Sequence, residues 1–253
     1  MHPSMACAGQ PFTKYLSITM CGRFALALNA RNAVDPTADW IDEPVFVPRF
    51  NIAPRTYAPV IRNVAGNRVL HSMKWGLVPH WSTVEDKSLS TTNARSENLV
   101  QGGGMWASIK GKNRCAVVCQ GYYEWLDKRP HFVKRKDGQL MLMAGLYDHA
   151  TIAGVSLWTF AIVTTDACAD FSWLHDRQPV ILSTQDALQA WLDPSTQSWT
   201  PALTKLVQPY GDQERHPLEW YVAVSIYIRW THCRQLSGPK GSRQSGDGIS
   251  IFY

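Results

Sequence analysis

The sequence predicts an α+β fold, in which a single domain is built on a curled, mostly antiparallel β-sheet that is barrel-like and is flanked by short helices. Three observations lead to this prediction. Most apolar runs are short and rich in β-branched and aromatic residues, as strands are. Only a few stretches place apolar residues at helical spacing. Proline-containing turns separate the runs, and no segment recurs at a fixed period, which excludes a repeat architecture.

Six runs carry the strand pattern. They are residues 58–64, 68–78, 114–126, 131–136, 139–150 and 156–165. Two of these runs flank the sequence Lys-Asp-Gly-Gln at 136–139, and Asp-Gly readily supplies the positive φ angles of a tight turn. We therefore expect these two strands to form a hairpin.

Helical patterns are fewer and shorter. In residues 183–193 a Ser or Thr in the N-cap position precedes apolar residues at helical spacing, and residues 200–209 repeat this pattern in a shorter form. A third helix is expected to begin near Ser96. The glycine-rich stretch 102–111 is expected to be a mobile connection to the next strand.

The composition is that of a globular protein, and the overall charge of its body is too small to attract a polyanion. The chain has 253 residues, of which 45% are hydrophobic and 18% are charged, so it can bury a sizeable core. The formal net charge is +5, but most of the excess lies in residues 1–20 and 226–253. Between them the chain is nearly neutral, so an anion site must arise from local clustering of basic side chains.

The six cysteines are too few and too scattered for a disulfide framework, which favours a reducing, intracellular compartment. Cys115 and Cys119 have no nearby histidine or second cysteine pair to complete a zinc pattern, so neither a metal nor a cofactor is expected. No run approaches the roughly 18 apolar residues that a membrane span needs.

Five separated stretches contain the chemically suggestive residues. They are MCGRFAL, PRFNIAPRT with WGLVPHW, TTNARSEN, GYYEW and WLHDRQPVIL. In order, wording and spacing they resemble the SRAP family, the SOS-response-associated peptidases, from Met20 to about Tyr221. The resemblance implies an SRAP domain over residues 20–225, preceded by a leader (1–19) and followed by a divergent, disordered tail (226–253).

The resemblance also implies four catalytic residues: Cys21, Asn93, Glu124 and His175. In the family the cysteine becomes N-terminal and forms a thiazolidine with the ring-opened aldehyde of an abasic site in DNA. A 1,2-aminothiol is needed because its amine forms an imine and its thiol then closes the ring. With a pKa of about 7.7–8.0 the α-amine is far less protonated at neutral pH than a lysine. Asn93 is expected to orient the amine and the sugar, while Glu124 and His175 are expected to move protons.

Further residues are carried over as the DNA interface. Arg23, Arg95 and Arg177 each follow a catalytic position by two residues, which on a strand returns the side chain to the same face. We expect these guanidinium groups to clamp phosphates. Trp75 and Trp125 are counted in the DNA interface, where their indoles are expected to pack or stack beside the pocket, and Arg49 and Asn51 are expected to shape that pocket. The predicted ligand is single-stranded or junction DNA that carries abasic sites and is bound with little sequence preference.

These residues predict an abasic-site DNA–protein crosslinking enzyme of the lyase or thiol-autopeptidase type. Because 19 residues precede Met20, Cys21 must be exposed by cleavage after Met20 or by initiation at Met20, and the second is preferred. Two alternatives remain open: a thiol peptidase or amidohydrolase of the N-terminal-nucleophile kind, and a non-catalytic nucleic-acid-binding remnant. A monomer with replication-associated partners is expected, in the nucleus of a eukaryote or the cytoplasm of a bacterium.

Overall fold

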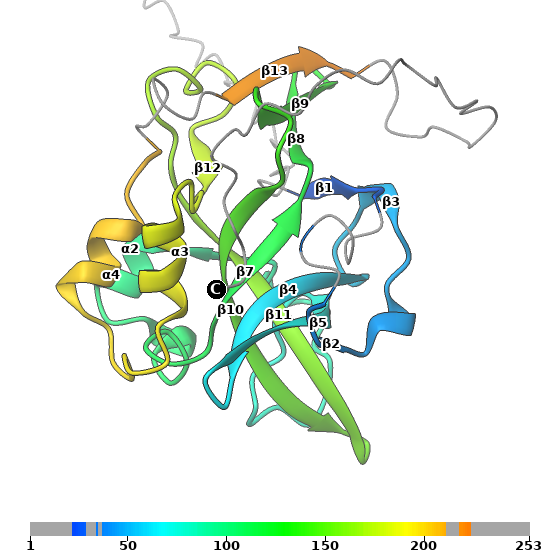
Figure 1. The fold of residues 1–253 in the computed structure, drawn as a ribbon, viewed down its shortest axis with the longest axis vertical. Coiled ribbons are helices and arrows are strands. Elements are labelled where there is room, and N and C mark those ends of the chain that lie inside the picture. The colour runs from blue at the N-terminus through cyan, green and yellow to red at the C-terminus, as the bar shows by residue number, and fades with distance from the viewer. Residues whose placement is uncertain (1–21, 29–33, 35–36, 211–217, 224–253) are drawn as a thin grey trace, which may run out of the picture.

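The computed structural model describes residues 22–28, 34, 37–210 and 218–223 (Figure 1). The leader (1–19) and the tail (226–253) predicted from the sequence lie outside the described residues, so the domain boundaries stay predictions. The strands are β1 (Arg23–Leu26), β2 (Trp40–Ile41), β3 (Arg49–Ile52), β4 (Tyr57–Val64), β5 (Asn67–Trp75), β6 (Asn93–Arg95), β7 (Arg114–Cys119), β8 (Gly121–Leu126), β9 (Arg129–Arg135), β10 (Met141–Ile152), β11 (Val155–Asp166), β12 (Arg177–Pro179) and β13 (Leu218–Val222). The helices are α2 (Ser96–Val100), α3 (Gln185–Leu192) and α4 (Pro201–Leu206), with short 3₁₀ turns η1 (Glu43–Val45) and η2 (Gly104–Trp106).

Five strands close into a barrel in the order β11-β10-β7-β4-β5. The barrel closes because β5 returns to β11 in a parallel pair, with Phe160 opposite Trp75, whereas the other four pairings are antiparallel. In Figure 1 the three helices lie together on one side of this barrel. The predicted α+β fold with a curled, mostly antiparallel, barrel-like sheet and short flanking helices is confirmed.

A second sheet, in the order β13-β9-β8-β1-β3, adjoins the barrel. The sequence predicted one strand over 114–126, but the chain forms two strands that belong to different sheets and meet at Gln120. The backbone N–H of Gln120 donates to the carbonyl of Ala25, and its side-chain oxygen accepts from the N–H of Ala27, both at 2.7 Å. Gln120 therefore ties β1 to the point where the chain leaves the barrel.

The helices and their connections pack on the barrel. Thr184 and Thr200 cap α3 and α4 by accepting hydrogen bonds through their side chains, as the sequence predicted. Trp191 of α3 is fully buried, and its indole donates to the Cys115 carbonyl at 2.8 Å. The connection 102–111 was expected to be mobile, but it holds η2, and both Trp106 and Ile109 are buried in the core. None of the described helices has the length and apolarity that a membrane crossing requires.

Candidate functional site

The predicted nucleophile, Cys21, lies outside the described residues, but its neighbour Gly22 is described. Strand β1 pairs with β8, and Arg23 is opposite Tyr123 at the end of this ladder. One residue further along each strand are Gly22 and Glu124. Glu124 is only 2% exposed. The two strands therefore bring a buried carboxyl group beside the residue that follows Cys21.

The two faces of β8 differ in character. Neighbouring residues of a strand point to opposite faces, so Glu124 shares its face with its cross-strand partner His131, whereas Trp125 lies on the other face. Trp125 is half-buried and packs on Tyr123, with ring centroids 6.4 Å apart. Arg23 is opposite Tyr123 and thus also lies on the face away from Glu124. The predicted DNA contacts of Trp125 and Arg23 remain predictions, on the face opposite the carboxyl group.

Asn93 begins β6, and the backbone before it is fixed by two donors. The carbonyl of Thr92 accepts from the N–H of Ile162 at 3.0 Å and from the indole of Trp75 at 2.9 Å. Trp75 is fully buried and packs against Phe24 of β1, at 5.0 Å between ring centroids. Of the two roles expected for Trp75, packing and stacking on DNA, the structure shows packing: the ring belongs to the core, where it links β1 to the backbone that positions Asn93.

His175 lies in the turn that precedes β12. Its Nδ1 accepts a hydrogen bond from the N–H of Arg177 at 3.1 Å and lies 2.6 Å from a carboxylate oxygen of Asp176. Burial lowers the pKa of His175 from its ordinary value, Arg177 lowers it further, and Asp176 opposes them. The lowered pKa favours the neutral form of the ring at pH 7, which is the form that can accept a proton.

Arg177 is engaged by protein groups. Its guanidinium donates to both carboxylate oxygens of Glu97 at 2.9 and 2.8 Å, to Asp166 at 2.8 Å and to the Thr164 carbonyl at 3.1 Å. Burial raises the pKa of Glu97, but the hydrogen bonds from Arg177 and the charges of Arg177 and Arg95 outweigh burial, so the net pKa is lowered. The predicted phosphate clamp at Arg177 would require DNA to exchange with these carboxylates. Sequence reasoning missed Glu97, although it follows Asn93 in the same motif.

The remaining predicted arginines differ in availability. The Arg23 guanidinium donates to Asn51 on β3 at 3.0 Å, so this pair braces β1 against β3. Arg49 is half-buried and donates to the carbonyl of Val47. Arg95 is exposed at the start of α2. Among the four predicted arginines, Arg95 is the one whose side chain is most open to a phosphate.

The cysteines of the barrel are unsuited to nucleophilic chemistry. Cys115 and Cys119 are fully buried in β7, and burial raises the pKa of both thiols, which keeps them protonated. Within the described ranges, no three His, Cys, Asp or Glu side chains are grouped so that they could hold a metal ion.

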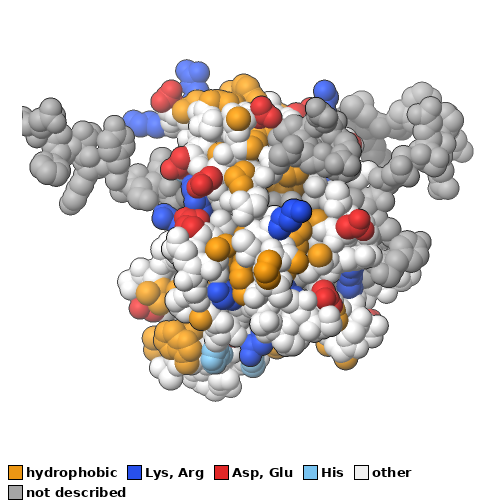
Figure 2. All heavy atoms as spheres, turned by 90° about the vertical axis from the view of Figure 1, so that its left-hand side faces the viewer, with side chains coloured by type: hydrophobic (Ala, Val, Ile, Leu, Met, Phe, Trp, Pro, Cys, Tyr) orange, Lys and Arg blue, Asp and Glu red, His pale blue; other side chains and the backbone are white. Residues whose placement is uncertain are grey.

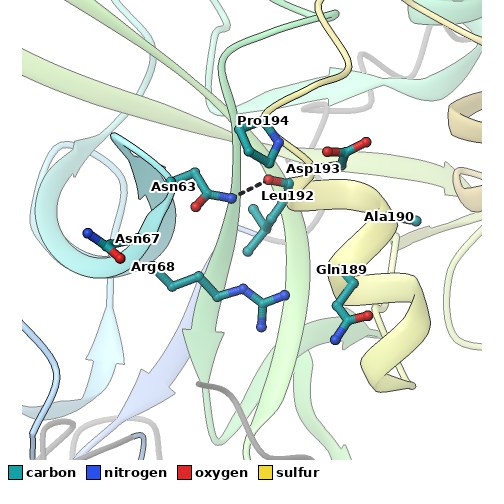
Figure 3. A pocket seen from close by; sticks show the side chains of 9 residues that line it. Asn63, Asn67, Arg68, Gln189, Ala190, Leu192, Asp193 and Pro194 are labelled. Carbon is teal, nitrogen blue, oxygen red and sulfur yellow. Dashed lines mark hydrogen bonds between the residues drawn. The ribbon is translucent and has the colours of Figure 1, made fainter. Parts of the chain in front are cut away.

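Of two cavities on the described part of the chain, the larger contains none of the predicted site residues and the smaller reaches the residue before Asn93. The larger, of about 750 Å³, separates the β4–β5 turn from α3, and the side chains of Asn63, Asn67 and Arg68 lie across it from Gln189 (Figure 3). None of the predicted site residues lines it. A smaller cavity of about 330 Å³ reaches Thr92, the residue before Asn93. The smaller cavity is therefore the one that lies beside a predicted site residue in the chain.

An exposed aromatic residue lies in the same motif stretch as the buried Trp75. Trp81 is 63% exposed and follows Trp75 in the WGLVPHW stretch. On the face shown in Figure 2, Lys and Arg side chains are interspersed with Asp and Glu, and they form no continuous basic patch there. This distribution fits the near-neutral charge of the body of the chain.

Residues 20–226 match the family described as "SOS response associated peptidase (SRAP)". The chain is 33% identical over 238 residues to the abasic site processing protein of Saccharomyces cerevisiae, which covers 80% of this chain and 63% of that protein. It is 34% identical over 219 residues to the abasic site processing protein YoaM of Bacillus subtilis, covering 82% of this chain and 92% of that protein. The chain thus spans less than two thirds of the yeast relative and almost all of the bacterial one.

Solved structures share the fold. A protein from Bacteroides thetaiotaomicron superposes with a TM-score of 0.68 at 24% identity, over 80% of this chain and 91% of that one. A phage-related protein from Bordetella bronchiseptica superposes with a TM-score of 0.60 at 28% identity, over 81% and 95% of the two chains.

Proposed function

The chain belongs to the SOS response associated peptidase family, and from that premise we propose that it processes abasic sites in DNA by forming a covalent adduct through Cys21. The relatives named above as abasic site processing proteins support the substrate class. Because the yeast relative extends well beyond the matched region, the proposal covers only the chemistry of the shared domain.

The observation that carries this proposal is the position of Glu124. The Glu124 carboxyl group is 2% exposed, so β8 holds it inside the protein, on the face that it shares with His131. Glu124 lies across from Gly22, which is joined to Cys21 by one peptide bond. A proton-transferring group is thus available next to the residue that would carry both the amine and the thiol.

The proposed reaction has two bond-forming steps. The α-amine of Cys21 attacks the aldehyde carbon of the ring-opened deoxyribose, and loss of water gives an imine. The thiol then adds to the imine carbon, the proton of the S–H group passes to nitrogen, and a thiazolidine ring closes. Glu124 and neutral His175 are the proposed groups that carry protons in these steps, and the Asn93 amide is proposed to orient the sugar oxygens.

The proposal requires an exposed α-amine at Cys21, and therefore a chain without the Met20–Cys21 peptide bond. An internal cysteine has only the thiol, and it would form at most a reversible hemithioacetal with the aldehyde. The DNA ligand is proposed to be single-stranded, with Arg95 contacting a phosphate beside the reacting sugar and the protein acting inside the cell.

Intact mass spectrometry tests the proposal. The protein is expressed from Met20, so that removal of this initiator Met exposes Cys21, and it is weighed before and after incubation with a single-stranded oligonucleotide that contains one abasic site. The expected result is a chain that begins at Cys21 and gains the mass of one oligonucleotide less one water. Cys21→Ala should give no stable adduct, and Glu124→Gln should slow its formation by about 100-fold or more.

Two results would overturn the proposal. A chain that begins at Cys21 and gains no mass would refute crosslinking and would favour a thiol peptidase. An adduct of unchanged yield in Cys21→Ala would show that another nucleophile reacts.

A further inference from the structure

Two half-exposed tryptophans lie together at the edge of the second sheet. Trp173, in the turn before β12, is 40% exposed, and Trp220, on β13, is 46% exposed. Their ring centroids are 4.5 Å apart, and the ring of His131 lies 5.7 Å from the first and 5.6 Å from the second. We call Trp173, Trp220 and His131 the aromatic platform.

The platform adjoins two of the predicted catalytic residues. His131 on β9 is the cross-strand partner of Glu124 on β8, so the two side chains share one face of the sheet. Trp173 precedes His175 by two residues in the same turn. The platform therefore bridges the strand that carries the buried carboxyl group and the turn that carries the histidine.

Two of the three rings are held by hydrogen bonds to the backbone, and the third, Trp220, packs on both of them. The indole N–H of Trp173 donates to the Asp170 carbonyl at 2.9 Å, and Nδ1 of His131 lies 3.1 Å from the Arg129 carbonyl, an acceptor that places the proton on Nδ1. His131 itself is 6% exposed and supports the tryptophans from below. A fixed aromatic surface binds a flat ligand with little loss of conformational freedom.

The surroundings of the platform favour a nucleic acid over an apolar partner. The β8–β9 hairpin turns through Asp127 and Lys128, both at positive φ, and its tip presents three exposed side chains, of which Lys128 and Arg129 are basic and Asp127 is acidic. Strand alternation puts Arg129 on the same face as His131. Aromatic rings beside basic side chains match a chain of bases joined by phosphates.

We propose that the aromatic platform stacks one nucleobase of the DNA strand that flanks the abasic nucleotide. The inference rests on the proposed function, because it identifies the ligand from the neighbouring catalytic residues. Stacking on an indole does not depend on base identity, so the platform would hold the strand in register without selecting a sequence. It would fix the distance between the reacting sugar and the next ordered base.

The test is a double-mutant cycle between protein and DNA. Binding is measured by fluorescence anisotropy with Cys21→Ala as the background, so that no covalent adduct forms. The oligonucleotides carry one central abasic site, and in each of a series one flanking base is replaced by a base-free tetrahydrofuran. We expect Trp220→Ala and Trp173→Ala to weaken binding to the parent oligonucleotide about 5- to 100-fold. With the platform intact, removal of the base at one position should weaken binding as much as removal of an indole does. At that position the loss from removing both the base and the indole should be smaller than the sum of the two single losses.

Tyr221→Ala is the matched control. Tyr221 is on the same strand as Trp220 and is equally exposed, at 48%, but it lies on the opposite face and packs on Phe132. It should change affinity less than twofold. Trp220→Phe retains a ring and should recover most of the affinity, whereas a role in folding alone would alter the melting temperature without any dependence on the DNA position.

The two proposals fail separately. If the effects of removing an indole and removing a base add at every tetrahydrofuran position, while the protein that retains Cys21 still crosslinks, the platform is refuted and the crosslinking chemistry stands. Absence of the crosslink with clear coupling at one position would refute the chemistry and retain a single-stranded DNA platform.

Discussion

The barrel contains a buried histidine whose protonation should destabilise the fold in mild acid. His71 on β5 is 1% exposed, and its Nδ1 accepts a hydrogen bond from Nε of Arg62 at 3.0 Å. Protonation would break this bond and place two cations together. Burial and the charge of Arg62 lower the pKa of His71 from 6.5 to about 4, although Asp42, 3.4 Å from Nε2, opposes the shift.

The direction of the pH effect follows from this lowered pKa. Between pH 6.5 and about 4 the unfolded chain binds a proton at His71 that the folded chain does not bind. Stability therefore falls as the pH falls through this window, and it is fully retained above it. Each unit of difference in pKa corresponds to about 1.4 kcal/mol, so His71 should remove about 3 kcal/mol of unfolding free energy between pH 7.5 and pH 4. That is a large share of the roughly 5–15 kcal/mol that stabilises an ordinary domain.

Urea denaturation at a series of pH values measures this contribution. The comparison is with His71→Gln, whose side-chain carbonyl can accept from Arg62 but does not titrate. The stability difference between the two proteins should shrink by about 3 kcal/mol as the pH falls, at equal m-values, while carboxylates and the other histidines contribute equally to both. Parallel stability curves over this range would refute the assigned role of His71.

Three further substitutions probe the supports of the site. Trp75→Phe removes a fully buried indole and its hydrogen bond to the Thr92 carbonyl, which still accepts from the N–H of Ile162. We expect the free energy of unfolding, measured by urea denaturation, to fall by about 2 kcal/mol. Crosslinking should also slow, because Asn93 is less firmly positioned. Wild-type crosslinking in a destabilised protein would separate Trp75 from Asn93. Glu97→Gln weakens the internal partner of Arg177, so the plot of log affinity for single-stranded DNA against log salt should steepen by about 0.7, the contribution of one more phosphate contact; an equal slope would show that Asp166 and Thr164 retain the guanidinium. Gly121→Ala would place a methyl group against the Val133 carbonyl and 2.7 Å from the Phe132 ring, which should cost about 1–3 kcal/mol and lower the melting temperature by several degrees; an unchanged melting temperature would show that β9 can move away.

The barrel was predictable because its strands are long and carry their own pattern. Strands β10 and β11 each span 12 residues rich in apolar and β-branched side chains. The Asp-Gly sequence before β10 does form a turn, with Gly138 at positive φ, but the predicted hairpin is wrong: β9 pairs with β8 and β13 in the second sheet, whereas β10 pairs with β7 and β11 in the barrel. The break at Gln120 was not predictable, because residues on both sides favour strands. Hydrogen bonds from β1, almost a hundred residues away in the chain, decide where the break falls.

Site residues were predictable as motif positions, but their environments were not. Arg177 and Glu97 are 80 residues apart, and no local pattern indicates that one holds the other. Likewise, Trp75 and Trp81 occur in one short stretch, yet the first is fully buried and the second is 63% exposed. Exposure depends on which strand covers the ring, here β1 through Phe24, and this is a property of the tertiary fold.

The internal partners of the arginines bear on how this chain can hold DNA. Arg177 is bound by two carboxylates and Arg23 by an amide, so each phosphate contact at these positions must offset the loss of an existing one. Electrostatic binding should therefore be weaker than a count of basic residues implies, and its salt dependence correspondingly shallow. A DNA-binding protein with this charge distribution needs a contribution to affinity that salt does not screen, and we propose that bases stacking on the exposed indoles of Trp81, Trp173 and Trp220 supply it. We therefore expect that replacing these rings with alanine lowers the affinity for single-stranded DNA more than raising the salt to a moderate concentration does. A polycationic DNA-binding protein would already dissociate at that salt concentration.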